Sequence, residues 1–301
     1  MDYSKYKFRA VVDWLSLEIN TIKYTNFQSI KNTINVPYVE ALDKGEGSRA
    51  SKFIFKFHDP KNWGEIKEIL RTLEEKFPLA KAPTIHSIEV SIDLYSRTAT
   101  KFEMIELTEY FFRNLSHPVS NNYRVSGTKL KAARKSPGRK EIVDLLNEGR
   151  NICIGNIEHS NYGGMVVAAD DEYMQIYYKT TDNNGKIQLP PSEHRVRIEI
   201  RLSGNALPSV TVQEGESYKF ELLAKYFNMR KVKQNLLYSA PISIQQAFER
   251  VTQLGSLNTK SERKNAVITE ADILLNDKFY NTLRDLSRRM INTQKAGKTL
   301  H

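Results

Sequence analysis

Three segments of the chain alternate strictly between apolar and polar side chains, which constrains the fold more than its composition does. They are residues 88–95 (IEVSIDLY), 173–179 (YMQIYYK) and 194–202 (HRVRIEIRL). Side chains on a strand alternate between its two faces, so alternation over this length predicts three strands. One antiparallel sheet, apolar on one face and charged on the other, accommodates all three.

The remaining patterns predict an α+β protein. Helical periodicity places Ile66, Ile69, Leu70, Leu73 and Phe77 on one stripe, Met104, Leu107, Phe111 and Leu115 on a second, and Leu275, Phe279, Leu283, Leu286 and Met290 on a third. These stripes predict helices near 62–77, 102–115 and 270–291, packed on the apolar face of the sheet. An opening strand is expected near 8–19, and Thr269 with Asp272 is spaced like a capping box ahead of the last helix.

The apolar periodicity of the sequence changes from that of strands to that of helices after Leu207 and Pro208. We therefore expect a domain over 1–210 and a mostly helical C-terminal region over 211–301.

Composition favours a polyanionic partner. The chain has 301 residues, a formal net charge of +10 and a pI near 9.4, which suits nucleic acid or an anionic surface. It contains no apolar run near the length of a membrane span, and no apolar segment follows the amino terminus as in a secretory signal. A single cysteine, Cys153, has no partner for a disulfide. A cytoplasmic protein is expected.

Alternation along the strand places the two adjacent tyrosines on opposite faces. Tyr177 shares the polar face with Lys179, whereas Tyr178 points with the apolar Met174 and Ile176. Tyr177 is therefore the candidate nucleophile and Tyr178 a core residue. A phenol needs a nearby cation or base to react at neutral pH, and Lys179 offers a charge on the same face. The alternative is that Tyr177 is an ordinary cross-strand aromatic.

Carboxylates on the same faces are candidate metal ligands. Glu89 and Asp93 are about 13 Å apart along an ideal strand, so only one of them is expected to bind a given ion. Glu199 lies among Arg195, Arg197 and Arg201, which is also consistent with a salt-bridge ladder. Asp13 lies in the opening strand, where a carboxylate is costly unless paired or metal-bound.

The donor types select the metal. No two histidines are separated by a single residue, and a cysteine-based site lacks a second cysteine. A carboxylate-rich site suits Mg²⁺ or Mn²⁺ better than Zn²⁺. A Walker-type phosphate loop is also absent from the sequence.

A basic segment precedes the tyrosine strand. Residues 116–140 contain no acid and these basic residues: Arg124, Lys129, Lys131, Arg134, Lys135, Arg139 and Lys140. The segment is either a solvated loop or a DNA-contacting loop. In the second case its cations would contact phosphates and set affinity rather than sequence choice.

Four motifs in order resemble the rolling-circle replication initiators of small plasmids and filamentous phages. They are Val12–Leu15 (VDWL), Ser87–Glu89 (SIE), Ile176–Lys179 (IYYK) and Arg197–Glu199 (RIE), and Asn151–Gly155 (NICIG) resembles the approach to the tyrosine strand. The resemblance covers roughly residues 8–205. Ser87 and Glu89 stand where the family usually has Arg and Asp.

The resemblance implies a metal-dependent, site-specific DNA nickase and strand transferase. Tyr177 would attack a phosphate at a replication origin, remain linked to the 5′ end and leave a 3′ hydroxyl as a primer. Asp13, Glu89 and Glu199 would surround a Mg²⁺ or Mn²⁺ ion, and Lys179 and Arg197 would support the phosphate. A host helicase and a second copy of the chain are partners that the family implies.

Two other functions fit the same residues. A conjugative relaxase of a mobile element shares these motifs, and a non-catalytic DNA-binding protein would keep the basic sheet without cleaving DNA.

Overall fold

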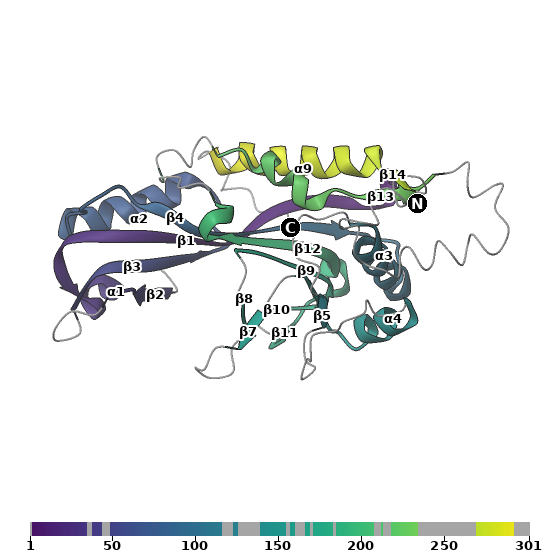
Figure 1. Ribbon diagram of the computed structural model, residues 1–301, viewed down its shortest axis with the longest axis horizontal. Helices are drawn as coiled ribbons and strands as arrows, with labels where there is room; N and C mark the ends of the chain where they lie inside the picture. The colour runs from purple at the N-terminus through teal and green to yellow at the C-terminus, as the bar shows by residue number, and fades with distance from the viewer. Residues whose placement is uncertain are drawn as a thin grey trace. The chain divides into compact units, whose positions relative to one another are not determined.

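The computed structural model has α+β architecture (Figure 1). It describes residues 2–34, 38–43, 49–115, 123–125, 139–154, 157–159, 166–168, 171–182, 185–207, 212, 218–233 and 269–291. Strands are β1 (Lys7–Asn26), β2 (Tyr38–Ala41), β3 (Arg49–His58), β4 (Thr84–Tyr95), β5 (Tyr123–Val125), β6 (Ile152–Ile154), β7 (Ile157–His159), β8 (Val166–Ala168), β9 (Glu172–Lys179), β10 (Thr181–Asp182), β11 (Ile187–Gln188), β12 (Arg195–Ser203), β13 (Arg230–Val232) and β14 (Thr269–Ala271). Helices are α1 (Phe27–Thr33), α2 (Trp63–Lys76), α3 (Lys101–Asn114), α4 (Arg139–Asn147) and α9 (Ile273–Ile291), with 3-10 turns η1 (Tyr3–Lys5), η3 (Pro191–Glu193), η4 (Gly204–Ala206) and η5 (Phe220–Phe227).

An eight-stranded sheet has the order β2-β3-β1-β4-β12-β9-β6-β5. The pairs β1 with β3, β2 with β3, β5 with β6 and β6 with β9 are antiparallel. The three strands predicted by alternation are β4, β9 and β12, and they are consecutive in this order as β4-β12-β9. Their placement in one sheet is thus confirmed.

The chain divides into two compact units. The first comprises Met1–Arg9, Ile92–Ile200 and Glu221–Leu283, and the second comprises Ala10–Ser91, Arg201–Phe220 and Arg284–His301.

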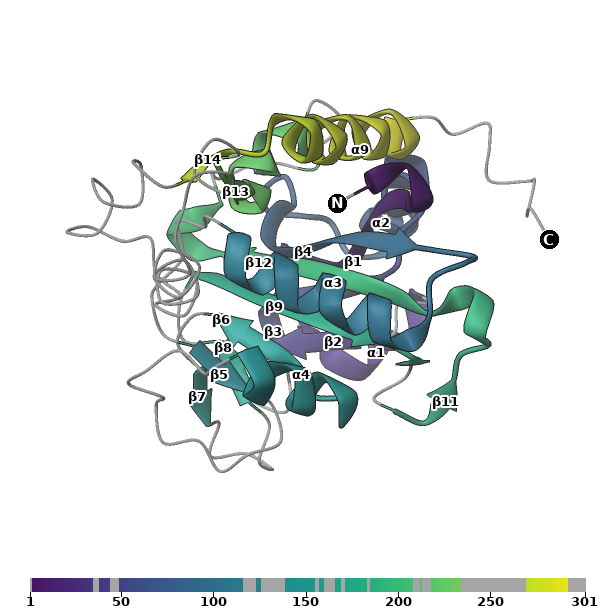
Figure 2. The ribbon, with the colours of Figure 1, turned by 90° about the vertical axis from the view of Figure 1, so that its right-hand side faces the viewer.

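Helices and aromatic rings form the core of the first unit. Figure 2 shows α3 and α4 side by side, and α3 packs on β9. The ring of Phe279 in α9 packs edge-on against Phe8, Phe111 and Phe227 at centroid distances of 5.8, 6.0 and 6.2 Å. The predicted apolar stripes of the second and third helices are buried, as expected for core packing.

The second unit is built on the pairing of β1 with β3, which run together over much of their length (Figure 1). Phe53, Phe55 and Phe57 alternate along β3 and are buried. Of the stripe predicted for α2, Ile66, Leu70 and Leu73 are buried, whereas Ile69 and Phe77 are half-buried. The strand β3 is not among those predicted from the sequence, although its Phe-x-Phe-x-Phe pattern is a strand signal.

Side-chain caps set the helix starts. The Asn62 side chain accepts a hydrogen bond from the Glu65 amide at 3.0 Å and starts α2. Thr100 and Glu103 form a capping box at the start of α3.

The predicted cap of the last helix is wrong in one residue. The Asp272 side chain accepts from the Leu275 amide at 3.2 Å, and its other oxygen accepts from the Tyr3 hydroxyl at 2.6 Å. Thr269 instead lies in β14, where its hydroxyl accepts from Arg230 at 2.9 Å. Pairing of β13 with β14 therefore delays the helix beyond the predicted start.

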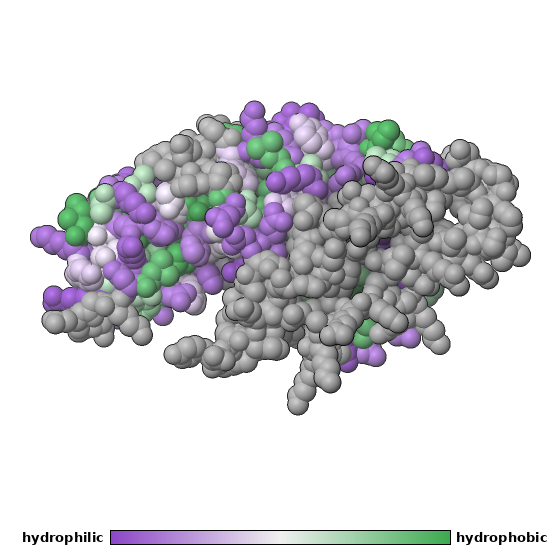
Figure 3. All heavy atoms as spheres, viewed as in Figure 1, coloured by the Kyte–Doolittle hydropathy of each residue, from purple (hydrophilic) through white to green (hydrophobic). Residues whose placement is uncertain are grey.

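Exposed apolar side chains are scattered on the visible face. Figure 3 shows mostly hydrophilic described residues there, with small separate hydrophobic spots. No described helix is long and apolar enough to span a membrane.

We predict that Asn62→Ala lowers the free energy of unfolding by about 1 kcal/mol, because the first turn of α2 loses its cap. Urea unfolding followed by circular dichroism measures this change. Gln28→Ala, on the exposed surface of α1, is the control and should change stability much less. Equal losses from the two variants would contradict the cap.

Candidate active site

The two adjacent tyrosines of β9 have different environments. Tyr177 is half-buried, whereas Tyr178 is buried with the neighbouring Met174 and Ile176. The Tyr178 hydroxyl lies 3.2 Å from His194 Nδ1. His194 Nε2 lies 3.0 Å from the Leu189 carbonyl, which only accepts, so Nε2 is the donor of that hydrogen bond. Burial also raises the pKa of Tyr178.

Tyr177 contacts a carboxylate on the neighbouring strand. Its hydroxyl donates a hydrogen bond to Glu199 Oε2 at 3.0 Å. Glu199 belongs to β12 and is only 8% exposed. This bond places a proton acceptor directly on the phenol oxygen, which is what a tyrosine nucleophile requires.

Glu199 is also one of three clustered carboxylates. Asp13, Glu89 and Glu199 each offer one oxygen, and these oxygens lie within 4.8 Å of one another. The three residues come from β1, β4 and β12, which are neighbours in the strand order. We call these three residues the acidic cluster. It combines residues that are far apart in the sequence.

The acidic cluster could hold a divalent metal ion. Ligand oxygens about 2.1 to 2.5 Å from one ion are at most about 4 to 5 Å apart, which matches the separation in the cluster. All three donors are carboxylates, the hard ligands that Mg²⁺ and Mn²⁺ prefer. Asp13 additionally accepts a hydrogen bond from the Ser91 hydroxyl, which orients its carboxylate.

Asp93, the alternative candidate on β4, has a different environment. It is 1% exposed, and Arg197 donates to both of its oxygens, from Nε at 2.6 Å and from a terminal nitrogen at 2.7 Å. Arg195 Nε lies 3.1 Å from Asp93 Oδ2, close enough for an ion pair although its angle is too poor for a hydrogen bond. Tyr95 donates to the same oxygen at 3.2 Å. Asp93 is therefore the acceptor of a buried arginine network.

This network affects the neighbouring tyrosine. Burial, and then the negative charge of Asp93, raise the pKa of Tyr95 to about 12. Tyr95 consequently stays a neutral donor at physiological pH. Arg197, expected to support a phosphate, lies in this buried ion pair.

Lys179 lies in an ion pair at the end of β9. Its ammonium is 2.5 Å from Asp182 Oδ1, and the lysine side chain is 15% exposed. Burial alone would raise the pKa of Asp182, but the hydrogen bond and charge of Lys179 outweigh it and lower that pKa. Asp182 was not predicted to belong to the site, and the sequence shows only its spacing of three residues from Lys179.

Tyr173 is a second phenol on the Tyr177 face, and the sequence pattern assigns it no role. It is buried, and its oxygen accepts from Gln175 Nε2 at 3.2 Å. Burial, and then the neighbouring Cys153, strongly raise its pKa. Of these two phenols on one face, Tyr177 is the one whose hydroxyl donates to Glu199.

The basic segment is only partly described. Arg124 lies in β5, at the edge of the sheet. Lys129, Lys131, Arg134 and Lys135 lie outside the described residues. Their predicted contact with DNA stays a prediction.

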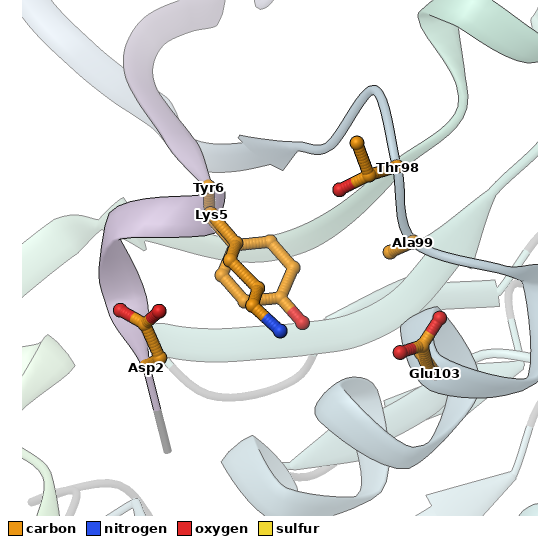
Figure 4. A pocket seen from close by; sticks show the side chains of 6 residues that line it. All are labelled: Asp2, Lys5, Tyr6, Thr98, Ala99 and Glu103. Atoms are coloured by element: carbon orange, nitrogen blue, oxygen red, sulfur yellow. The ribbon is translucent and has the colours of Figure 1, made fainter.

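A separate hollow of about 240 Å³ lies at the start of α3. Figure 4 shows Asp2, Lys5, Tyr6 and Glu103 around it, with Thr98 and Ala99. Glu103 is used in the capping box, and Asp2 accepts from Ser4. The hollow contains none of the residues that the sequence predicts for catalysis.

No family model and no curated protein matches this chain. Among solved structures, the chain is similar to a rolling circle replication initiator protein from Geobacillus stearothermophilus. The two share 13% sequence identity with a TM-score of 0.33, over 82% of this chain and 97% of that chain. A similarity this low carries no functional argument, so function is inferred below from the residues of this chain.

We predict that Asp93→Ala lowers the free energy of unfolding by about 3–5 kcal/mol, because Arg197 would keep its buried charge without its partner. Asp182→Ala is a matched control at a more exposed ion pair and should cost less than about 1 kcal/mol. Urea unfolding compares the two variants. Similar losses would contradict the role assigned to the buried network.

Proposed function

We propose that this chain nicks one DNA strand with Tyr177 as the nucleophile and acts as an initiator of rolling-circle replication at a plasmid or phage origin. The hydrogen bond from Tyr177 to Glu199 carries the proposal, because Glu199 also belongs to the acidic cluster. A nucleophile, its proton acceptor and a carboxylate-rich metal site are then adjacent. The four ordered sequence motifs and the net charge of +10 support DNA as the substrate.

The chemistry follows from this arrangement. Tyr177 Oη attacks the phosphorus, and its proton passes to Glu199. The bond from phosphorus to the 3′ oxygen breaks, and that oxygen takes the proton now held by Glu199 to become the free 3′ hydroxyl. The products are a 5′-phosphotyrosine link and a primer end, so a high-energy cofactor is not required.

The acidic cluster fits the metal requirement of this reaction. Asp13, Glu89 and Glu199 would hold Mg²⁺ or Mn²⁺, which when bound neutralises charge on the transferring phosphate. The protein supplies fixed carboxylates on adjacent strands. Ser91 contributes by orienting Asp13.

Two basic residues are proposed to support the phosphate. Lys179 is proposed to exchange Asp182 for a phosphate oxygen, since a partly exposed ion pair is weak. Arg197 is proposed to act from its buried pair with Asp93 by adding positive charge near Glu199. The basic residues Arg124, Lys129, Lys131, Arg134 and Lys135 are proposed to bind the DNA backbone.

We predict that Tyr177→Phe abolishes covalent attachment to DNA, since the attacking oxygen is removed. Tyr178→Phe should keep attachment and lower stability by about 1 kcal/mol, because it loses the hydrogen bond to His194. The purified chain is incubated with Mg²⁺ or Mn²⁺ and supercoiled DNA from its own replicon. Mass spectrometry then maps any DNA-linked peptide.

A 5′-phosphate adduct on Tyr177 is the expected result. Loss of the adduct in both variants with folding intact would contradict the assignment of Tyr177. DNA binding without an adduct in either metal would favour the non-catalytic DNA-binding protein.

We predict that Glu199→Ala slows metal-dependent nicking by roughly 10²–10⁴-fold, because the proton acceptor and one metal ligand are lost. DNA binding should change little, since affinity rests on basic residues. Glu75→Ala, on the exposed surface of α2, is the control. Binding that falls together with nicking would show that Glu199 has mainly a structural role.

A conjugative relaxase would use the same bond cleavage. Nicking of a replication origin with extension of the 3′ end by a polymerase favours replication. Nicking confined to a transfer origin would favour the relaxase.

A further inference from the structure

Four side chains of the second unit lie together on one face of the strands β2, β3 and β1. Tyr38 is directly opposite Lys56, and His58 is directly opposite Trp14. Directly paired residues share a face, and so do residues two apart on one strand. Tyr38, Lys56, His58 and Trp14 therefore form a continuous surface, which we call the aromatic-basic strip.

The Tyr38 and His58 rings of the strip are exposed, and Trp14 is half-buried. Lys56 Nζ lies 4.5 Å from the centroid of the Tyr38 ring, a cation–π distance. The Trp14 and His58 rings are 4.7 Å apart with an interplanar angle of 55°. Tyr38 is 41% exposed, and His58 is also exposed. These rings offer faces on which a flat group can stack.

Two cations, Lys56 and Arg201, and two carboxylates, Glu40 and Glu89, interact electrostatically at the strip. Lys56 is partly buried, and burial and then the positive charge of Arg201 lower its pKa, opposed by Glu40 and Glu89. Two neighbouring cations that disfavour each other gain stability when an anion binds both.

We propose that the aromatic-basic strip binds the single-stranded DNA on which the proposed nicking reaction acts. Bases stack on the rings of Tyr38 and Trp14, and Lys56 and Arg201 bind a phosphate. A base replaces the Lys56 ammonium over the Tyr38 ring, and that ammonium moves to the phosphate. The inference rests on the proposed function, because it identifies where the strand is held for that reaction.

Single-stranded DNA fits this surface better than duplex DNA does. Aromatic faces next to cations are the usual means of binding unpaired bases, whose π faces are open. In a duplex these faces are covered by neighbouring bases. The competing explanation is that Lys56 and Tyr38 only stabilise β2, which is an edge strand of the sheet.

The test measures binding of the full chain to fluorescein-labelled oligothymidylate by anisotropy, with EDTA present so that cleavage is prevented. Tyr38→Ala should weaken binding by roughly 5- to 150-fold through lost stacking. Tyr38→Phe should retain wild-type affinity. Tyr280→Ala is the matched control, since Tyr280 is 44% exposed on α9, and its affinity should also be unchanged.

Salt dependence separates the phosphate contacts from stacking. The slope of log binding constant against log salt should fall in magnitude by about 0.7 in Lys56→Ala and in Arg201→Ala. The slope should be unchanged in Tyr38→Ala. Glu40→Gln should strengthen binding, because Glu40 accepts from the Tyr38 hydroxyl at 2.9 Å and its charge repels phosphate.

Wild-type affinity of Tyr38→Ala for the oligonucleotide would overturn the proposal that the strip binds single-stranded DNA. Equal weakening of binding by Tyr38→Phe and Tyr38→Ala would also overturn it. Circular dichroism of each variant distinguishes lost binding from lost folding. An adduct on Tyr177 together with unchanged DNA binding in Tyr38→Ala would support the proposed nicking activity and contradict only the proposed binding by the strip. Absence of any adduct would overturn the nickase, while the binding data would still decide whether the strip holds single-stranded DNA.

Discussion

The pleat of the hydrogen-bonded strands is the constraint on which the candidate site depends. Because successive side chains point to opposite faces, Tyr177 and Tyr178 receive opposite environments. A shift of one residue in β9 would bury the phenol that contacts Glu199 and expose the one that contacts His194. The buried residues on both sides of Tyr177 make such a shift costly, since Met174, Ile176 and Tyr178 would all leave the core.

Buried charge pairs fix the side chains around this strand. Asp93 is held by two hydrogen bonds from Arg197, and Arg197 lies two residues before Glu199 on β12. Breaking a buried pair is far more costly than breaking an exposed one, so the arginine network resists rearrangement more strongly than the pair of Lys179 with Asp182. A rigid carboxylate network and a more exposed lysine pair would both suit the proposed nicking site, which must keep its geometry while it binds and releases a phosphate.

The strip and the pair of Tyr177 with Glu199 would perform two different physical tasks in the proposed function. Tyr177 and Glu199 bring together a nucleophile and an acceptor, which is a matter of short distances. The strip instead combines exposed rings with cations, which in the proposal would give affinity without base selection. The net positive charge is a property of the whole chain, so it did not locate the strip or the pair of Tyr177 with Glu199.

Periodicity in the sequence was sufficient to predict β4, β9 and β12, the α+β class and the apolar stripes of three helices, because those patterns are local. It also gave the opposite orientations of Tyr177 and Tyr178. Local spacing failed at Thr269, where pairing between β13 and β14 overrides the cap. Alternation alone left Glu89 and Asp93 open and the resemblance named Glu89, whereas the tertiary structure gives the physical reason: Arg197 on β12 pairs with Asp93, and Glu89 lies with Asp13 and Glu199. It also decided that Lys56 contacts Tyr38, because cross-strand partners are set by register between segments that the sequence separates.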